Sequence, residues 1–185
     1  TIQVLVTATD AAGNTDVHTV VLTAKDVTDP VLTADADQDV DINTTAGCTV
    51  TIPDVMGSAS DNCAVTITQS PAVAASVMTS HNDTIQVLVT ATDAAGNTDV
   101  HTVVLTAKDV TNPVLNAELD QNLDINTTTG CTVSIPDVMG SATDNCTVTI
   151  TQSPMVAASV MTSHNDTIQV LVIATDLAGN ADTST

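Results

Sequence analysis

An internal repeat restricts the possible folds of this chain more than any other feature. Residues 1–24 recur unchanged as residues 84–107, and the same segment begins again at Thr167, so the period is 83 residues. The first two periods differ at only 11 positions. A period of this length is too long for one coil of a solenoid and fits a small domain. The 185 residues cover two periods and 19 further residues, and we expect the chain to belong to a longer array.

The repeated unit has the pattern of short β-strands. Val, Ile and Thr dominate residues 48–52, 64–68, 85–92 and 100–105, and several of these segments alternate apolar and polar residues with a period of two. Turn-forming sequences such as Asp93-Ala-Ala-Gly-Asn separate them. No segment has a sustained helical period. The pattern therefore predicts an all-β fold, an antiparallel β-sandwich in each period.

Proline-containing segments at 26–30 and 109–113 mark the expected module boundaries, because proline interrupts a β-ladder. We predict that residues 1–27 are the C-terminal strands of a preceding module. Residues 28–110 would then form a complete module, and residues 111–185 a second module that lacks its last strand. The alternative is that a neighbouring chain donates the missing strand.

Composition argues against several classes of function. The chain has no Phe, Trp or Tyr, two Lys and Arg residues in total, 22 acidic residues and a formal net charge of −20. It therefore lacks the basic and aromatic surface of a nucleic-acid-binding module, and no apolar run is long enough for a membrane-spanning helix. Ser80, His81 and Asp83 are adjacent in one turn without an oxyanion glycine motif, so we expect no enzyme.

Three motifs, in this order, carry a resemblance to a known family: Asp-x-x-Asp-Pro-Val-Leu at 26–32, Asp-Asn at 61–62, and Val-x-Ala-Thr-Asp-x-x-Gly-Asn at 89–97. The chain resembles hyalin repeat (HYR) modules, which are immunoglobulin-like sandwiches of extracellular and cell-surface proteins. Residues 47–53 and 60–63 resemble the bacterial version found in long secreted or surface-anchored proteins. The resemblance implies tandem immunoglobulin-like modules with an extracellular or cell-surface location, in a bacterium. Alanine and histidine stand where the family commonly has a cysteine pair, so that family disulfide is not expected.

The four cysteines repeat with the period. Cys48 and Cys63 are 15 residues apart, as are Cys131 and Cys146, so the spacing predicts one disulfide within each module. A disulfide of this loop length is worth roughly 3 kcal/mol in the chain-entropy model. A buried thiol pair and a metal site shared between modules are the alternatives.

Aspartate and asparagine residues recur at the linker, at one loop and at one turn of each module. Calcium takes six to eight oxygen ligands from such residues. Because the linker and the end loops of adjacent modules can meet in an end-to-end array, we predict Ca²⁺ between the modules. Ordinary Asx turns and solubilising charge are the alternative. The candidate ligands are Asp10, Asn14, Asp26, Asp29, Asp61, Asn62, Asp93, Asn97, Asp109, Asn112, Asp144 and Asn145.

These features favour a structural function. We expect a segment of an extracellular fibre, stalk or adhesin shaft, built of head-to-tail modules and stabilised by Ca²⁺. Its partners would be neighbouring copies of the same module, and possibly other chains of the same fibre, with no nucleic acid and no membrane insertion of this segment. The alternative is a cell-surface adhesin whose loops bind a glycan or a protein. The turn at 80–83 recurs unchanged at 163–166 and the turn at 93–97 is the same as that at 10–14, which favours the scaffold.

Overall fold

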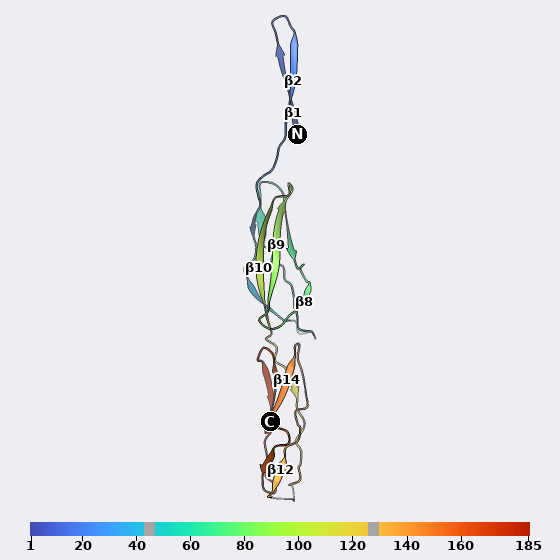
Figure 1. The fold of residues 1–185 in the computed structure, drawn as a ribbon, viewed down its shortest axis with the longest axis vertical. Helices are drawn as coiled ribbons and strands as arrows, with labels where there is room; N and C mark the ends of the chain where they lie inside the picture. The colour runs from blue at the N-terminus through green and yellow to red at the C-terminus, as the bar shows by residue number, and fades with distance from the viewer. Residues whose placement is uncertain (43–46, 126–129) are drawn as a thin grey trace.

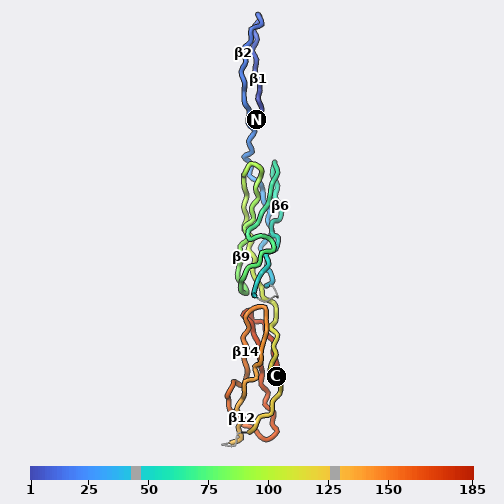
Figure 2. The backbone as a smooth tube through the Cα atoms, turned by 90° about the vertical axis from the view of Figure 1, so that its right-hand side faces the viewer, coloured from blue at the N-terminus to red at the C-terminus, as the bar shows by residue number. Residues whose placement is uncertain are grey.

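The computed structural model describes residues 1–42, 47–125 and 130–185 and shows an elongated rod (Figures 1 and 2). Three parts follow one another along it: a hairpin of residues 1–22, a group of strands between residues 31 and 108, which we call the first module, and a group of strands between residues 114 and 184, which we call the second module. The regular structure within the described residues is entirely β. The predicted all-β, immunoglobulin-like sandwich class is therefore confirmed. None of the described residues belongs to a helix long and apolar enough to cross a membrane.

The hairpin consists of β1 (Ile2–Thr9) and β2 (Thr15–Leu22), which pair antiparallel from Ile2 opposite Leu22 to Thr9 opposite Thr15. All residues of both strands are exposed to solvent. The turn of the hairpin forms one tip of the rod, and its open end leads into the first module (Figure 1).

The first module is a two-layer sandwich. One layer is a four-stranded sheet in the order β4-β10-β9-β7, and the short pairs β3-β6 and β5-β8 form the other strands. The strands are β3 (Val31–Thr33), β4 (Gln38–Asp41), β5 (Thr49–Thr51), β6 (Ser58–Ser60), β7 (Val65–Ser70), β8 (Ser76–Met78), β9 (Thr84–Asp93) and β10 (Thr98–Lys108).

The fully buried side chains in the core cluster of this module are aliphatic. Alternate residues of β9 and β10 point inward, including Val87, Val89 and Leu105, and each is fully buried. They pack against Val50 and Ile52 of the opposite layer in one cluster. Branched aliphatic side chains suit this position because they pack well on a pleated surface.

One strand pairing departs from the antiparallel prediction. The edge strand β4 runs parallel to the end of β10, with Gln38 opposite Leu105 and Asp41 opposite Lys108. The other strand pairings of the module are antiparallel, as predicted. The chain crosses from β3 in one layer to β4 in the other without changing direction. Strand β4 therefore lies at the edge of the main sheet and runs in the same direction as β10 (Figure 1).

The second module repeats the arrangement, but among the described residues its main sheet lacks a counterpart of β4. Its main sheet has the order β14-β16-β17, and β11-β13 and β12-β15 form short pairs. Val148 lies opposite Asp176 just as Val65 lies opposite Asp93, so the register is the same in both modules. The strands are β11 (Val114–Asn116), β12 (Thr132–Ser134), β13 (Ser141–Thr143), β14 (Val148–Ser153), β15 (Ser159–Met161), β16 (Leu171–Asp176) and β17 (Ala181–Ser184).

Candidate metal centre at the module junction

Three carboxylates converge where the first module meets the second. Asp109 follows β10, Asp144 lies in the loop between β13 and β14, and Asp176 ends β16. One oxygen from each of the three lies within 4.8 Å of the others. Asp109 is 3% exposed and Asp176 is 7% exposed. We call this group, together with Asn145, the second junction.

A tight turn positions Asp176. Its Oδ1 accepts hydrogen bonds from the backbone N–H groups of Gly179 (2.7 Å) and Asn180 (2.8 Å), and its Oδ2 accepts one from Asn180 Nδ2 (2.7 Å). Gly179 has a φ of +95°, a conformation that glycine adopts without strain. The local sequence Asp-x-x-Gly-Asn therefore builds this corner of the junction.

The loop before β14 contributes two oxygens that lack partners. Asp144 Oδ2 accepts a hydrogen bond from the backbone N–H of Cys146 (3.0 Å), and Asn145 Nδ2 donates to Asp109 Oδ1 (3.2 Å). Among the described residues, Asp144 Oδ1 and Asn145 Oδ1 are buried without a hydrogen-bond partner. A buried oxygen atom without a hydrogen-bond partner lowers the stability of the folded state. Carboxylate and amide oxygens in this arrangement are the ligands that Ca²⁺ prefers.

The linker is bonded to both modules. The backbone N–H of Asp109 donates to Nδ1 of His81 in the first module at 3.0 Å. Its carbonyl oxygen accepts from Asn180 Nδ2 in the second module at 3.2 Å. These contacts fix Asp109 between the two modules, so that its carboxylate stays beside Asp144 and Asp176.

A disulfide crosses this junction. Cys48 of the first module is bonded to Cys146 of the second, with their Cα atoms 4.9 Å apart. Beside the bond, the backbone N–H of Cys48 donates to the carbonyl of Asn145 at 3.1 Å. The junction is therefore closed by a covalent bond and by a backbone hydrogen bond.

The predicted pairings of Cys48 with Cys63 and of Cys131 with Cys146 are wrong, because Cys63 and Cys131 are free and exposed. Cys48 precedes β5, at the end of the first module that faces the second. The chain then runs through β5 and β6 to the opposite end before it reaches Cys63. Cys48 and Cys63 are only 15 residues apart in the sequence, but they therefore lie at opposite ends of the module.

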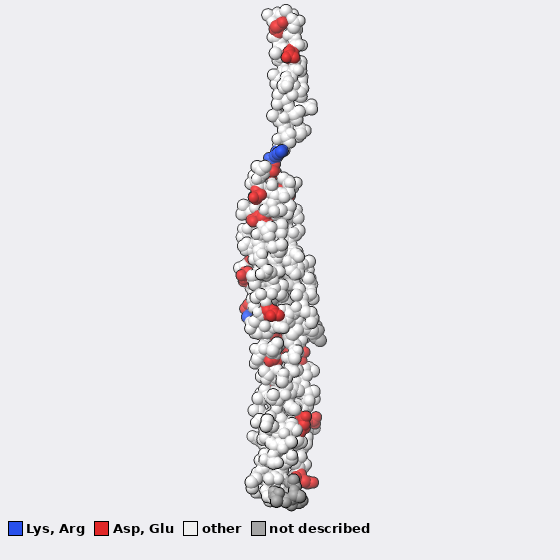
Figure 3. Space-filling model, in the orientation of Figure 1, with Lys and Arg blue, Asp and Glu red and all other residues white. Residues whose placement is uncertain are grey.

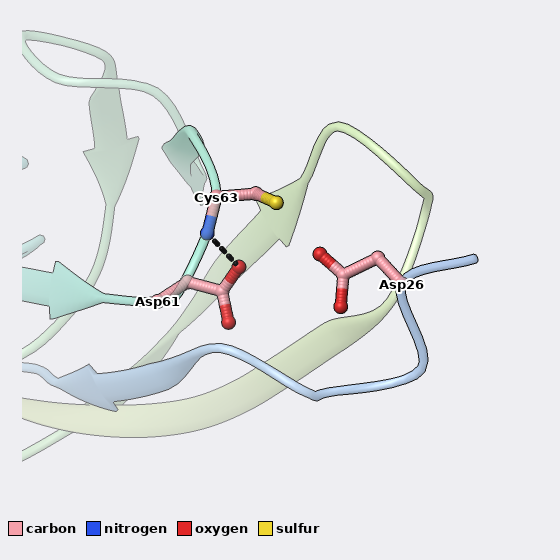
Figure 4. A group of neighbouring side chains, drawn as sticks. All are labelled: Asp26, Asp61 and Cys63. Carbon is pink, nitrogen blue, oxygen red and sulfur yellow. Dashed lines mark hydrogen bonds between the residues drawn. The ribbon is translucent and has the colours of Figure 1, made fainter. Parts of the chain in front are cut away.

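The same acidic residue types gather at the other end of the first module. Asp26 of the linker and Asp61 of the loop after β6 point toward each other, with the Cys63 sulfur beside them (Figure 4). Asn62 Nδ2 donates to Asp26 Oδ2 at 3.2 Å, and the backbone N–H of Cys63 donates to Asp61 Oδ2 at 2.9 Å. Asp61 Oδ1 is buried without a partner among the described residues. We call Asp26, Asp61, Asn62, Cys63 and Asp93 the first junction.

Hydrogen bonds at the first junction shift the pKa values of three of its side chains. The bond between the Asp26 carboxylate and the Cys63 thiol lowers the pKa of Asp26, and the backbone N–H of Thr28 adds to this. The same bond raises the pKa of Cys63, and partial desolvation and the charges of Asp26, Asp61 and Asp93 act in the same direction. Burial acts to raise the pKa of Asp93, but the hydrogen bonds from Asn97, Gly96 and Ala95 outweigh it and lower that pKa. The carboxyl groups of Asp26 and Asp93 therefore ionise more easily than usual, and the thiol of Cys63 loses its proton less easily.

Some predicted ligands lie elsewhere. Asp10 and Asn14 form the exposed turn at the tip of the hairpin, where Asn14 Nδ2 donates to Asp10 Oδ2 at 2.8 Å. Asp29 and Asn112 are exposed and belong to neither acidic group. Asn97 supports Asp93 through its side-chain amide at 2.7 Å.

The candidate list omitted Asp176 and Asn180, although both lie at the second junction. They are Asp93 and Asn97 shifted by one period, so a strict application of the repeat would have included them. It also omitted His81 as a linker contact. No sequence signal identifies that role, since the same histidine recurs as His164, which is exposed.

Comparisons with known proteins give little further information. No family model matches the chain, and no curated protein matches it. Among solved structures, the human desmocollin-1 ectodomain is similar with a TM-score of 0.30 and 12% sequence identity. The alignment covers 95% of this chain and spans 39% of that ectodomain.

Proposed function

We propose that this chain is a structural segment of an extracellular fibre, stalk or adhesin shaft, built from head-to-tail immunoglobulin-like modules and stabilised by Ca²⁺. One observation carries the proposal. The junction between the two modules is buried, bonded on both sides and crossed by a disulfide, in a molecule extended along one axis. Such a junction carries tension from one module to the next and holds the two modules in a fixed relative orientation.

The linker supports this function because it offers little freedom. Lys108 ends β10, and its carbonyl oxygen accepts a hydrogen bond from the backbone N–H of Ile42 at 2.8 Å. The next residue, Asp109, is bonded to both modules. Val110, Thr111, Asn112 and Pro113 then lead into β11, without the Gly and Ser residues of a flexible linker.

Calcium would act at the second junction through Asp109, Asp144, Asn145 and Asp176. The carboxylates repel one another at close range, and the chain has only two Lys and Arg residues against 22 acidic residues. A divalent cation would offset this repulsion and supply the missing partner of the buried Asn145 oxygen. Figure 3 shows acidic side chains spread over the visible face of the rod, without a basic patch.

An extracellular location is part of the proposal. The disulfide supports it, because disulfides persist in oxidising compartments. The order of the three hyalin-repeat motifs supports membership of that family and a bacterial cell surface. The second candidate function, an adhesin that binds a glycan or protein through its loops, is less favoured because the turn at 80–83 is identical to its copy at 163–166. The turn at 93–97 is identical to its copy at 10–14 and differs from its copy at 176–180 at one position.

Small-angle X-ray scattering of the 185-residue chain tests the proposal. In millimolar Ca²⁺ we expect the profile of a rigid rod. With the Asp144→Ala variant, or with chelator present, we expect more bending at the second junction. The matched control is Asp10→Ala, which alters a turn outside both junctions and leaves the profile unchanged. The profile of modules on a flexible string in every condition would contradict the proposed function.

A further inference from the structure

The disulfide joins positions that recur with the repeat. Cys131 is Cys48 shifted forward by one 83-residue period, and Cys63 is Cys146 shifted back by one period. The observed bond therefore links the first type of cysteine in one module to the second type in the next. Cys63 and Cys131, which are both free and exposed, are one cysteine of each type.

The surroundings of Cys63 match those of the bonded Cys146. The backbone N–H of Cys63 donates to Asp61 at 2.9 Å, and that of Cys146 donates to Asp144 at 3.0 Å. The preceding asparagine donates to the linker aspartate at 3.2 Å in both places. Its side-chain nitrogen lies 3.6 Å from the sulfur of Cys63 and 3.7 Å from that of Cys146. Cys63 thus already has the local geometry of a bonded junction cysteine.

The surroundings of Cys131 match those of the bonded Cys48. Both residues follow a glycine and have a φ of +48°, which is uncommon for a residue with a side chain. The carbonyl oxygen of Cys48 accepts from the N–H of Thr79 at 3.1 Å, and that of Cys131 accepts from Thr162 at 2.9 Å. The backbone at Cys131 therefore presents its thiol at the outer end of the second module as Cys48 does at the end of the first.

We propose that Cys63 and Cys131 are covalent joining sites for further copies of this module. Cys131 bonds to the cysteine at the Cys63 position of a following module, and Cys63 bonds to the cysteine at the Cys131 position of a preceding module. This inference rests on the proposed head-to-tail function and extends it. Every junction of the array would then carry one disulfide, and the modules would form one covalent ladder.

The chemistry is thiol–disulfide exchange with a small disulfide as oxidant. One protein thiolate attacks the small disulfide, forms a mixed disulfide and releases one small thiol. The second protein thiolate then attacks the protein sulfur of the mixed disulfide and releases the second small thiol. Two protein thiols are oxidised, one small disulfide is reduced to two small thiols, and the two protons of the protein thiols end on those small thiols.

The main test lengthens the chain by one period, with residues 103–185 appended after Thr185 and the appended copy of Cys131 changed to serine, in a buffer of oxidised and reduced glutathione. Non-reducing peptide mapping should find the Cys131 peptide bonded to the appended copy of the Cys146 peptide. The Cys48–Cys146 bond should be present as well. A free thiol at Cys131, or bonds within one module, would overturn the proposal.

A second arm identifies whether separate chains can supply the partner. The Cys63→Ser and Cys131→Ser variants of the 185-residue chain each keep one of the two joining thiols. If chains join end to end, a mixture of the two variants forms a disulfide dimer at least about tenfold faster than either variant alone, which is a difference of about 1.4 kcal/mol in the barrier. If only the lengthened chain forms the Cys131 bond, the partner comes from the same chain. Failure of that bond in both arms overturns the proposal.

The scattering profile of the lengthened chain separates this inference from the proposed function. A rigid rod with Cys131 free would contradict the joining sites and leave the shaft intact. A flexible chain of modules would contradict the shaft itself.

Discussion

The two junctions of this chain contain the same residue types but differ in burial. Asp109 and Asn145 at the second junction are 3% and 6% exposed. Their counterparts at the first junction, Asp26 and Asn62, are half-buried and exposed. Both junctions have a buried aspartate oxygen, at Asp61 and at Asp144, that has no hydrogen-bond partner within the described part of the chain.

The difference in burial comes from the residues that cover the acidic side chains at each junction. At the second junction, the end of the first module contributes Cys48, Ser80 and His81 to the walls of a small cavity beside Asp109. At the first junction, the β1–β2 hairpin contributes no residue to the acidic group. The acidic residues are therefore arranged by their own module, and the neighbouring module buries the linker aspartate and the asparagine of the loop, Asp109 and Asn145.

The largest expected effect comes from breaking the disulfide of the second junction. The Cys146→Ser variant should lose about 2–4 kcal/mol of the free energy of unfolding, because the bond closes a long loop in the unfolded chain and joins the two modules. Its sequence separation is 98 residues. Urea unfolding measures the loss. The matched variant Cys63→Ser should leave the unfolding midpoint unchanged, and equal losses in the two variants would contradict the difference between the junctions.

Calcium should act more strongly at the buried junction. A ligand that binds only the folded state adds about 2.7 kcal/mol at 100 times its dissociation constant. We expect the Asp144→Asn variant to abolish most of the Ca²⁺-induced rise in melting temperature, and Asp61→Asn to reduce it less. Differential scanning calorimetry in millimolar Ca²⁺ and in excess chelator gives both shifts. An unchanged melting temperature of the original chain, with no bound metal by elemental analysis, would reduce the acidic groups to surface charge.

Acid should weaken the turn at Asp93. The folded pKa of this carboxyl is lowered from its ordinary value of 3.8, so its contribution to stability is fully present above that value and is lost as the pH falls through the folded pKa. The Asp93→Asn variant should be less stable than the original chain at neutral pH and should lose less stability on acidification. Denaturant titrations at pH 7 and at pH about 3 measure this. The control is Asp10→Asn, which changes the same turn in the exposed hairpin.

The smallest effect should follow from removing the histidine contact of the linker. The His81→Ala variant loses the acceptor of the Asp109 N–H at the second junction, and a hydrogen bond of this kind contributes about 0.5–1.5 kcal/mol. The control is His164→Ala, which removes the exposed copy one period later. A urea midpoint that moves equally in both variants would show that the linker contact adds nothing.

The two copies of the hairpin show how much of the fold the sequence could predict. Residues 1–24 and 84–107 are identical and pair in the same register, as Ile2 with Leu22 and Ile85 with Leu105. Their burial is opposite, since Val6 is 52% exposed and its copy Val89 is fully buried. Strands, turn and register follow from the local sequence. Burial depends on strands from elsewhere in the fold, which no local pattern contains.

The candidate site was predictable to a similar degree. The linker, the loop and the turn were expected to meet at module ends, and the structure brings Asp109, Asp144 and Asn145 together there. The cysteine pairing was not predictable from spacing, because the number of residues between two cysteines does not show at which end of the module each one lies. Combining the repeat with the strand directions would have placed Cys48 opposite Cys146.

Electron micrographs of the native, negatively stained material test the central claim most directly. The account predicts thin, straight filaments with an axial repeat of one module, about 40 Å if strands of 8–10 residues advance by ~30 Å and the linker adds the remainder. Removal of Ca²⁺ together with reduction of the disulfides should make the same filaments bend at regular intervals. Isolated compact particles without an axial repeat would contradict the shaft and favour a module that binds through its loops.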